Sequence, residues 1–272
     1  MRSAITVSLV PQAAGGPFVF WNGLSTACES ASALGFDAIE IFPSSADSID
    51  RDELRALLAK HNLTVAAIGS GAGWVVKKLT LTHADPVIRE TARAFVKAIV
   101  DLAAEFGAPA ILGSMQGRWE GGVTRERALS FLGEALEDLG EHAARLGAPF
   151  LYEPLNRFET NLFNRVGDTA AWLRTLRTKN VRILADLFHM NIEEADLAAA
   201  IIEARDLIGH VHFADSNRRA VGLGHTDIAS AYAALDKIGY DGFLSAEILP
   251  LPDAETAARE TMRSFQKLTR ST

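Results

Sequence analysis

The sequence has a single cysteine, no long apolar run and no excess of positive charge, and each absence excludes a class of protein. Cys28 is the only cysteine among the 272 residues, so no disulfide can form within the chain and a disulfide-stabilised secreted fold is excluded. The apolar run near the start ends at Pro11 and is too short for a signal peptide. We therefore expect a cytoplasmic protein that does not contact membranes.

The chain is also acidic. Its formal net charge is −7 and its isoelectric point is about 5.5, so long-range electrostatics give no attraction to a phosphate backbone. Nucleic acid is therefore not an expected partner, and a small molecule is. Hydrophobic residues make up 48% of the chain and charged residues 22%, which is the balance of an ordinary globular protein.

Short apolar segments alternate with longer segments of helical periodicity, and the pattern occurs eight times. Most of the short segments are apolar throughout, which is typical of parallel strands that are covered on both faces. The predicted strands lie at 4–10, 38–42, 63–69, 109–113, 149–153, 181–186, 208–213 and 242–247. The longest loops after strands are expected at 11–23, 70–83 and 214–225.

Two of the intervening segments, 84–107 and 124–147, show the helical pattern clearly. Each ends on a glycine that can adopt the left-handed conformation after a helix, and Thr124 can cap the start of the second. The joint Gly-Ala-Pro between helix and strand occurs in both. Eight βα units in a chain of this length predict an α/β fold, a single (β/α)₈ TIM barrel domain over residues 1–272.

Four residues of metal-ligand type fall at the carboxyl ends of four consecutive predicted strands. Glu153, Asp186 and Glu247 are the last residues of their strands, and His212 is the last but one. TIM barrels keep their active sites at this face, so we expect the four side chains to converge. Three carboxylates cannot share such a place without a cation or shared protons.

Three carboxylates and one imidazole form a mixed donor set. This set suits Mn²⁺, Co²⁺ or Mg²⁺ and is compatible with Zn²⁺, although structural zinc sites prefer thiolates and more imidazoles. Any one of these residues alone could be an ordinary polar group at the mouth of a barrel. Four of them at matching strand ends predict one bound divalent metal ion.

The segments around these residues resemble a known family. YEPLNRFET, ADLFHMNIEE, HVHFADSNRR and FLSAEI are similar to segments of the xylose isomerase-like TIM barrels, the family of sugar phosphate isomerases and epimerases. Within it they most resemble the ketose 3-epimerases of the tagatose and psicose 3-epimerase type. The resemblance is specific over residues 150–250 and follows the strand order over the rest of the chain.

The resemblance implies a role for each matching residue. Glu153, Asp186, His212 and Glu247 would bind one divalent metal ion, and the two glutamates would also be the catalytic pair that transfers protons. A proton beside a ketone is too weakly acidic for a free carboxylate, and a divalent cation would stabilise the enediolate as a Lewis acid. Glu153 and Glu247, on opposite faces of that carbon, would act as base and acid and invert it.

Three further residues match the family in type and spacing. Glu159, His189 and Arg218 would bind the substrate by its oxygens at the C1 to C3 end of a sugar. The resemblance therefore implies a metal-dependent ketose 3-epimerase that acts on a small sugar or sugar-like molecule. Barrels of this type commonly pair, so we also expect a homo-oligomer.

Other enzymes could use the same ligands. A sugar, sugar phosphate or hydroxypyruvate-type aldose-ketose isomerase would pass through the same enediolate, and an inosose or dehydroshikimate-type dehydratase would need a leaving group beside the abstracted proton. An endonuclease for abasic DNA shares the fold but needs more His and Asp ligands and a basic surface, and a non-catalytic barrel would be expected to lack one glutamate. We therefore rank the epimerase first, the isomerase second and the dehydratase third.

Several other residues have two interpretations each. Glu40 is expected to be a buried polar residue that could also contact substrate, and Arg157 to pair with a neighbouring acid. The loops that follow the early strands differ from the family's pattern. Their cationic residues could meet a phosphate or carboxylate or lie at the surface, and their tryptophans could line the pocket or pack over the rim: Lys77, Lys78, Arg118, Trp21, Trp74 and Trp119.

Overall fold

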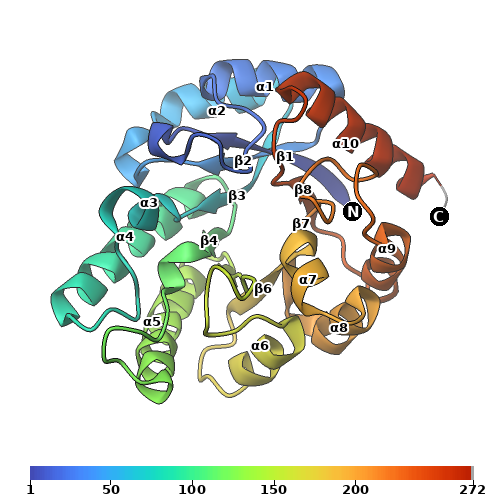
Figure 1. The fold of residues 1–272 in the computed structure, drawn as a ribbon. Coiled ribbons are helices and arrows are strands. Elements are labelled where there is room, and N and C mark those ends of the chain that lie inside the picture. The colour runs from blue at the N-terminus through green and yellow to red at the C-terminus, as the bar shows by residue number, and fades with distance from the viewer. Residues whose placement is uncertain (271–272) are drawn as a thin grey trace.

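The eight predicted strands form a closed parallel barrel in the computed structural model, which describes residues 1–270 (Figure 1). Each strand pairs with its neighbours in sequence, and the last pairs with the first. The strands are β1 Arg2–Ser8, β2 Ala38–Phe42, β3 Thr64–Gly69, β4 Ala110–Leu112, β5 Phe150–Tyr152, β6 Val181–Asp186, β7 Ile208–His212 and β8 Phe243–Ala246. The predicted TIM barrel is confirmed, and strand ends differ from the predicted bounds by about two residues at most.

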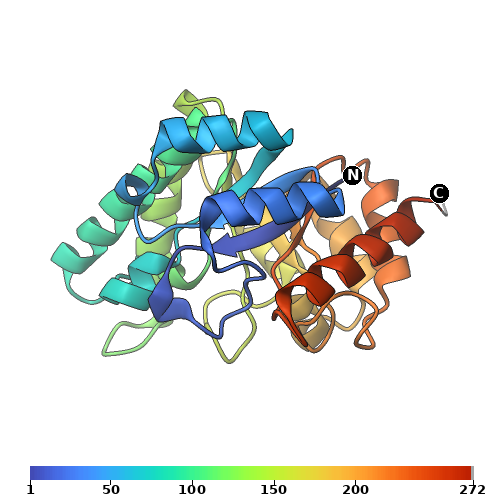
Figure 2. The same cartoon turned by 90° about the horizontal axis from the view of Figure 1, so that it is seen from above.

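Helices surround the barrel on its outer side (Figures 1 and 2). The last helix lies beside the first, so the ring of helices closes where the barrel closes. The helices are α1 Gly23–Leu34, α2 Arg51–His61, α3 Ala72–Lys77, α4 Pro86–Glu105, α5 Arg125–Arg145, α6 Val166–Leu173, α7 Leu187–Glu193, α8 Leu197–Ala204, α9 Ile228–Lys237 and α10 Ala254–Thr269, with 3₁₀ turns η1 Pro11–Ala13, η2 Ala46–Ser48, η3 Ser114–Gln116 and η4 Arg205–Leu207.

The ends of α4 and α5 follow from their sequences. The Thr124 side chain accepts a hydrogen bond from the Arg127 backbone N–H at the start of α5, as predicted. Gly107 and Gly147, just after the two helices, have φ values of 64° and 75°, a conformation that glycine adopts without steric cost. One expectation was wrong: the segment 70–83, predicted as a loop, contains the short helix α3.

Buried side chains form two layers, one outside the barrel and one within it. The larger cluster lies between the strands and the helices. A smaller one consists of Ala67, Ile111, Leu151 and Leu184. Side chains two residues apart on a strand point to the same side, so Leu184 points inward with Asp186. The inner layer therefore forms an apolar floor under the carboxyl ends of the strands.

Among residues 1–270, no helix combines the length and the apolar character that crossing a bilayer requires.

Candidate metal centre and active site

The four predicted metal ligands converge at the carboxyl ends of β5 to β8. One ligand atom from each of Glu153, Asp186, His212 and Glu247 lies within 4.8 Å of those of the other three. The distances from His212 Nδ1 are 3.6 Å to Glu153 Oε1 and 3.5 Å to both Asp186 Oδ2 and Glu247 Oε2. The four residues, which are far apart in the sequence, therefore form a single cluster in space.

The strand ends explain this convergence. Asp186 and His212 are the last residues of β6 and β7 and are paired in register, while Glu153 and Glu247 follow β5 and β8 by one residue. Asp186 also caps α7, because its Oδ1 accepts a hydrogen bond from the Phe188 backbone N–H at 2.8 Å. That bond occupies one carboxylate oxygen and leaves Oδ2 for the cluster.

The donor atoms of the cluster fit a divalent cation. Glu153 Oε1, Asp186 Oδ2 and His212 Nδ1 are buried and have no hydrogen-bond partner, whereas Glu247 Oε2 accepts from Arg218 Nη2 at 2.6 Å. A buried polar atom without a partner costs about 1–3 kcal/mol. Three such atoms facing one another are accounted for if a cation binds between them, and carboxylate oxygens with one imidazole nitrogen are suitable ligands.

The protonation of the cluster also reflects its crowded negative charge. Burial raises the pKa of Glu153 to about 7, although His212 opposes the shift. Burial acts on Asp186 too, but the imidazoles of His189 and His212 outweigh it and hold the pKa of Asp186 below its usual range. Burial would lower the pKa of His212, yet the surrounding carboxylates, first Glu40 and then Glu247, raise it well above its usual value. Positive charge is therefore stabilised at this place.

His189 lies beside the cluster with its two ring nitrogens in different settings. Nδ1 accepts a hydrogen bond from Asn156 Nδ2 at 2.7 Å. Burial lowers the pKa of His189 to about 4, so the ring is neutral at pH 7 and its proton lies on Nε2. Nε2 is 3.6 Å from Asp186 Oδ2 and has no hydrogen-bond partner. His189 is therefore a neutral donor aimed at the site.

Arg218 and Glu159 border the same site. Arg218 lies on the loop after β7 and has a φ of 57°, which is uncommon for a non-glycine residue. Its guanidinium bonds to Glu247, lies 3.7 Å from Glu159 Oε1 and stacks 4.7 Å from the centre of the Phe188 ring. Burial raises the pKa of Glu159. The predicted substrate residues and the predicted metal ligands thus belong to one constellation.

A cavity of about 360 Å³ opens above this constellation. Its lining includes metal-ligand candidates and Arg218. It also includes the aromatic rings of Trp74 and of Phe18 and Phe42, which stack at a centroid distance of 4.5 Å. The cavity therefore combines charged and aromatic side chains.

Three cations that could have met a phosphate do not line this cavity. Lys77 lies over the Phe95 ring at 5.3 Å and Lys78 over the Trp74 ring at 4.7 Å. Arg118 lies 3.7 Å from Glu120. These contacts favour the interpretation that the three cationic side chains lie at the surface and do not bind a phosphate or carboxylate of the substrate.

Two smaller expectations are resolved as well. Arg157 pairs with an acid, because its Nε lies 2.9 Å from Glu193 Oε1. Of the three loop tryptophans, Trp74 lines the cavity, whereas Trp21 and Trp119 do not. The indole N–H groups of Trp21 and Trp119 donate to backbone carbonyls.

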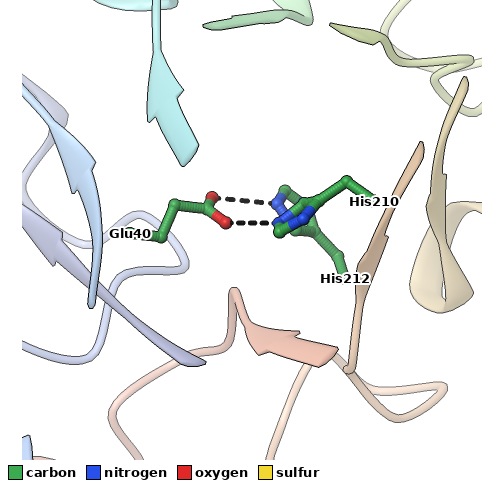
Figure 3. A group of neighbouring side chains, drawn as sticks. All are labelled: Glu40, His210 and His212. Atoms are coloured by element: carbon green, nitrogen blue, oxygen red, sulfur yellow. Dashed lines mark hydrogen bonds and ion pairs between the residues drawn. The ribbon is translucent and has the colours of Figure 1, made fainter. Parts of the chain in front are cut away.

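Sequence reasoning missed Asn156 and His210, which hold the site from behind, whereas Glu40 is buried as expected. Asn156 orients His189, and Glu40 bonds to both His210 and His212 (Figure 3). The sequence does contain one signal for the second group. His210 and His212 are two residues apart on a strand, so both rings point to the interior.

Comparison with known proteins identifies the family. A family model described as Xylose isomerase-like TIM barrel matches residues 28–268. The chain belongs to this family. The L-ribulose 3-epimerase of Methylomonas sp. (strain DH-1) is 30% identical over 86% of this chain and 83% of that protein. The 3-dehydro-D-guloside 4-epimerase of Escherichia coli (strain K12) is 30% identical over 79% of this chain and 82% of its own length.

A solved structure agrees with this xylose isomerase-like assignment. The crystal structure of D-allulose 3-epimerase from Methylomonas sp. in complex with D-allulose has a TM-score of 0.79 and 25% identity, and the match covers 98% of both chains. The resemblance to ketose 3-epimerases that the sequence segments indicated is confirmed. Because the relatives are named epimerases, the prediction of an isomerase-class enzyme is also confirmed.

Proposed function

We propose that this member of the xylose isomerase-like family is a divalent-metal-dependent ketose 3-epimerase. The observation that carries the proposal is the placement of two glutamates, Glu153 and Glu247, in the lining of the cavity and directly after the strands that flank those of Asp186 and His212. Inversion of a carbon needs a base on one face and an acid on the other. Two carboxylates separated in this way can supply both.

The four clustered residues would hold the metal ion, with Mn²⁺, Co²⁺ or Mg²⁺ as the best match to the donor set and Zn²⁺ as a compatible one. When bound, the cation supplies Lewis-acid stabilisation of the negative charge that develops on the substrate oxygens. The support comes from the three buried ligand atoms without partners, Glu153 Oε1, Asp186 Oδ2 and His212 Nδ1.

The remaining side chains orient the substrate. His189 donates from Nε2 to a substrate oxygen, and Asn156 keeps the ring in that orientation through Nδ1. Arg218 holds the Glu247 carboxylate at 2.6 Å and offers its other N–H groups to the carbonyl end of the ketose. Glu159 accepts from a substrate hydroxyl. One glutamate then removes the proton at C3 and the other returns a proton to the opposite face.

We further propose that the substrate is an uncharged ketose. Lys77, Lys78 and Arg118 do not line the cavity, whose lining includes the rings of Phe18, Phe42 and Trp74. A phosphate beside these rings would lose its hydration, and Arg218, the Lys or Arg residue in the lining, is already paired with Glu247. The name of the Methylomonas relative, an L-ribulose 3-epimerase, agrees with an unphosphorylated substrate.

Product analysis tests the reaction. Protein loaded with Mn²⁺ is incubated with D-fructose, D-tagatose and L-ribulose, and the products are separated by chromatography. We expect the 3-epimer of at least one ketose. An aldose as the main product would identify the isomerase, a product lacking one water would identify the dehydratase, and either would contradict the epimerase.

A further inference from the structure

Glu40 reaches across the inside of the barrel to two histidines (Figure 3). It lies on β2, and both His210 and His212 lie on β7, which is separated from β2 by β8 and β1. Its Oε2 is 2.7 Å from His210 Nε2, and its Oε1 is 3.0 Å from His212 Nε2. The three residues are at most 5% exposed. Both carboxylate oxygens are therefore occupied by one imidazole each.

We propose that Glu40 and His210 form a clamp that positions His212 as a ligand of the metal ion. The inference rests on the proposed metal-dependent function. Glu40 does not belong to the group of four ligand atoms and acts through His212. It is therefore a positioning residue.

The two nitrogens of His212 show how the clamp works. An ionised carboxylate can only accept hydrogen bonds, so Glu40 requires a proton on Nε2 of each imidazole that it contacts. In neutral His212 this leaves the lone pair on Nδ1. Nδ1 is the atom that faces Glu153, Asp186 and Glu247 at 3.5–3.6 Å. The hydrogen bond from Nε2 thus selects the tautomer and the ring orientation that metal binding needs.

His210 has a separate part in the clamp. It bonds to the second oxygen of Glu40, which prevents the carboxylate from turning about its last bond. The rings of His210 and His212 are nearly perpendicular, at 82°, with centroids 5.7 Å apart. Two bonds from differently oriented rings fix the plane of the Glu40 carboxylate, and that plane fixes His212.

Packing alone does not account for Glu40. In the sheet its register partners are Thr6 on β1 and Ala67 on β3, and its neighbours on β2 are isoleucines. An isolated buried carboxylate is strongly unfavourable, so an apolar side chain would serve packing better. The carboxylate is explained by the two imidazoles that it joins.

Direct titration of Mn²⁺ into the metal-free protein tests the clamp. Glu40→Leu removes both hydrogen bonds and keeps a side chain of similar size. His210→Phe removes only the bond between His210 and Glu40. We expect the Kd for Mn²⁺ to rise roughly 10–100-fold in Glu40→Leu, and less in His210→Phe, with one ion bound per chain. The visible absorption spectrum of bound Co²⁺ should differ from that of the wild type in both variants, because His212 Nδ1 is no longer held in one position as a ligand.

Asp101→Asn is the matched control. It weakens another carboxylate–imidazole contact, that between Asp101 Oδ1 and His142 Nε2 at 2.6 Å, on helices outside the barrel. The control should bind Mn²⁺ as the wild type does. If Glu40→Leu fails to fold, His210→Phe carries the test, since it keeps an aromatic ring at that place.

Three results would overturn the clamp. Unchanged Mn²⁺ affinity and Co²⁺ spectrum in the folded variants, with or without lower thermal stability, would show that Glu40 has a structural role only. Two ions per wild-type chain that fall to one in the variants would show that Glu40, His210 and His212 form a second metal site. A wild-type chain that binds no divalent metal would contradict the proposed function itself, which separates that failure from the failure of the clamp alone.

Discussion

At the scale of single residues, the place of the Glu153 carboxylate depends on a glycine on the neighbouring strand. A Cβ atom at Gly113 would lie 2.5 Å from Glu153 Oε2, which is closer than any non-bonded contact allows. Gly113 directly follows β4, and Glu153 directly follows β5. The absence of a side chain at one strand end therefore makes room for the proposed base at the next.

Gly113→Ala should displace the Glu153 carboxylate from the cluster. Because catalytic groups must be held within about 0.5 Å of their productive position, we expect a loss of roughly 10²-fold in kcat/KM and a higher Kd for Mn²⁺. Gly133→Ala is the control. Its Cβ would meet nothing closer than 3.7 Å in α5, so it should keep activity and stabilise the helix by up to about 1 kcal/mol. Unchanged activity in Gly113→Ala would contradict the role of Glu153.

Asn156→Ala tests the orientation of His189. The variant removes the 2.7 Å side-chain donor to His189 Nδ1 and leaves only the longer bond, at 3.3 Å, from the backbone N–H of residue 156. The ring is then held less firmly, which should cost about 1–3 kcal/mol in the transition state, or roughly 10–100-fold in kcat/KM. Mn²⁺ affinity should stay within a few-fold, because Asn156 does not contact the cluster. Asn161→Ala, which removes contacts to the Trp119 backbone only, should keep full activity; equal losses in both variants would argue against a specific role for Asn156.

The ligand set could be predicted from the sequence because each of its members occupies the end of a predictable strand. One rule, that the carboxyl ends of the strands meet at one face of the barrel, is enough to bring together Glu153, Asp186, His212 and Glu247. Asn156, Gly113 and the partners of Glu40 depend on distances between separate segments. Those distances follow from how the barrel closes and twists, which a pattern along one segment does not contain.

At the scale of elements, the loop after β7 is organised by one buried carboxylate. Asp215 accepts hydrogen bonds from the backbone N–H groups of Ser216 at 2.7 Å, Gly222 at 2.8 Å and Thr226 at 3.0 Å. Arg218 lies within this loop, in its left-handed conformation, and its own N–H donates to the Asp215 carbonyl at 2.8 Å. Asp215 therefore fixes the loop that delivers the guanidinium to the site.

Asp215→Asn should loosen this loop, because an amide NH₂ cannot accept the bonds that one carboxylate oxygen accepts. We expect a stability loss of about 1–3 kcal/mol in urea unfolding and a higher KM. Burial raises the pKa of Asp215, but the backbone N–H groups outweigh it and lower the pKa below its usual value. The carboxylate's stabilisation is thus full above the unfolded pKa of about 3.9 and declines as the pH falls towards the folded value. A difference between the two proteins that did not shrink in acid would contradict this account.

The regular elements were more predictable than the short ones. Apolar strands and helices such as α4 and α5 repeat a period over many residues. The short helix α7 begins where Asp186 caps it, and α3 lies within a segment rich in glycine. Such elements depend on a few local contacts, so periodicity does not identify them.

At the scale of the whole molecule, the metal ion should link the four strands that carry its ligands. A ligand that binds only the folded state stabilises it by about 2.7 kcal/mol at 100 times its Kd. For a chain of this length we expect Mn²⁺ to raise Tm by roughly 5–10 °C over the chelator-treated protein, as measured by calorimetry. His212→Ala should lose most of this shift, and a full shift in that variant would contradict the assigned ligand set.

The barrel as a whole followed from the sequence, because eight similar units leave few alternative architectures. Three statements about the whole molecule stay predictions: one domain over residues 1–272, a homo-oligomer, and a cytoplasmic location. The one-domain prediction rests on the eight strand–helix units, whereas oligomer contacts and location depend on surfaces and signals outside the barrel's core, which strand patterns do not describe.

Solvent-isotope labelling tests the central claim, proton transfer at C3 between Glu153 and Glu247, most directly. The Mn²⁺-loaded protein is incubated with free ketoses in D₂O, and the products are examined by NMR. We predict deuterium at C3 with inversion there, and a rate at least about 10²-fold lower in Glu153→Gln and in Glu247→Gln. Label at C1 or C2 with an aldose product, no exchange with any ketose, or full activity in Glu247→Gln would contradict the account.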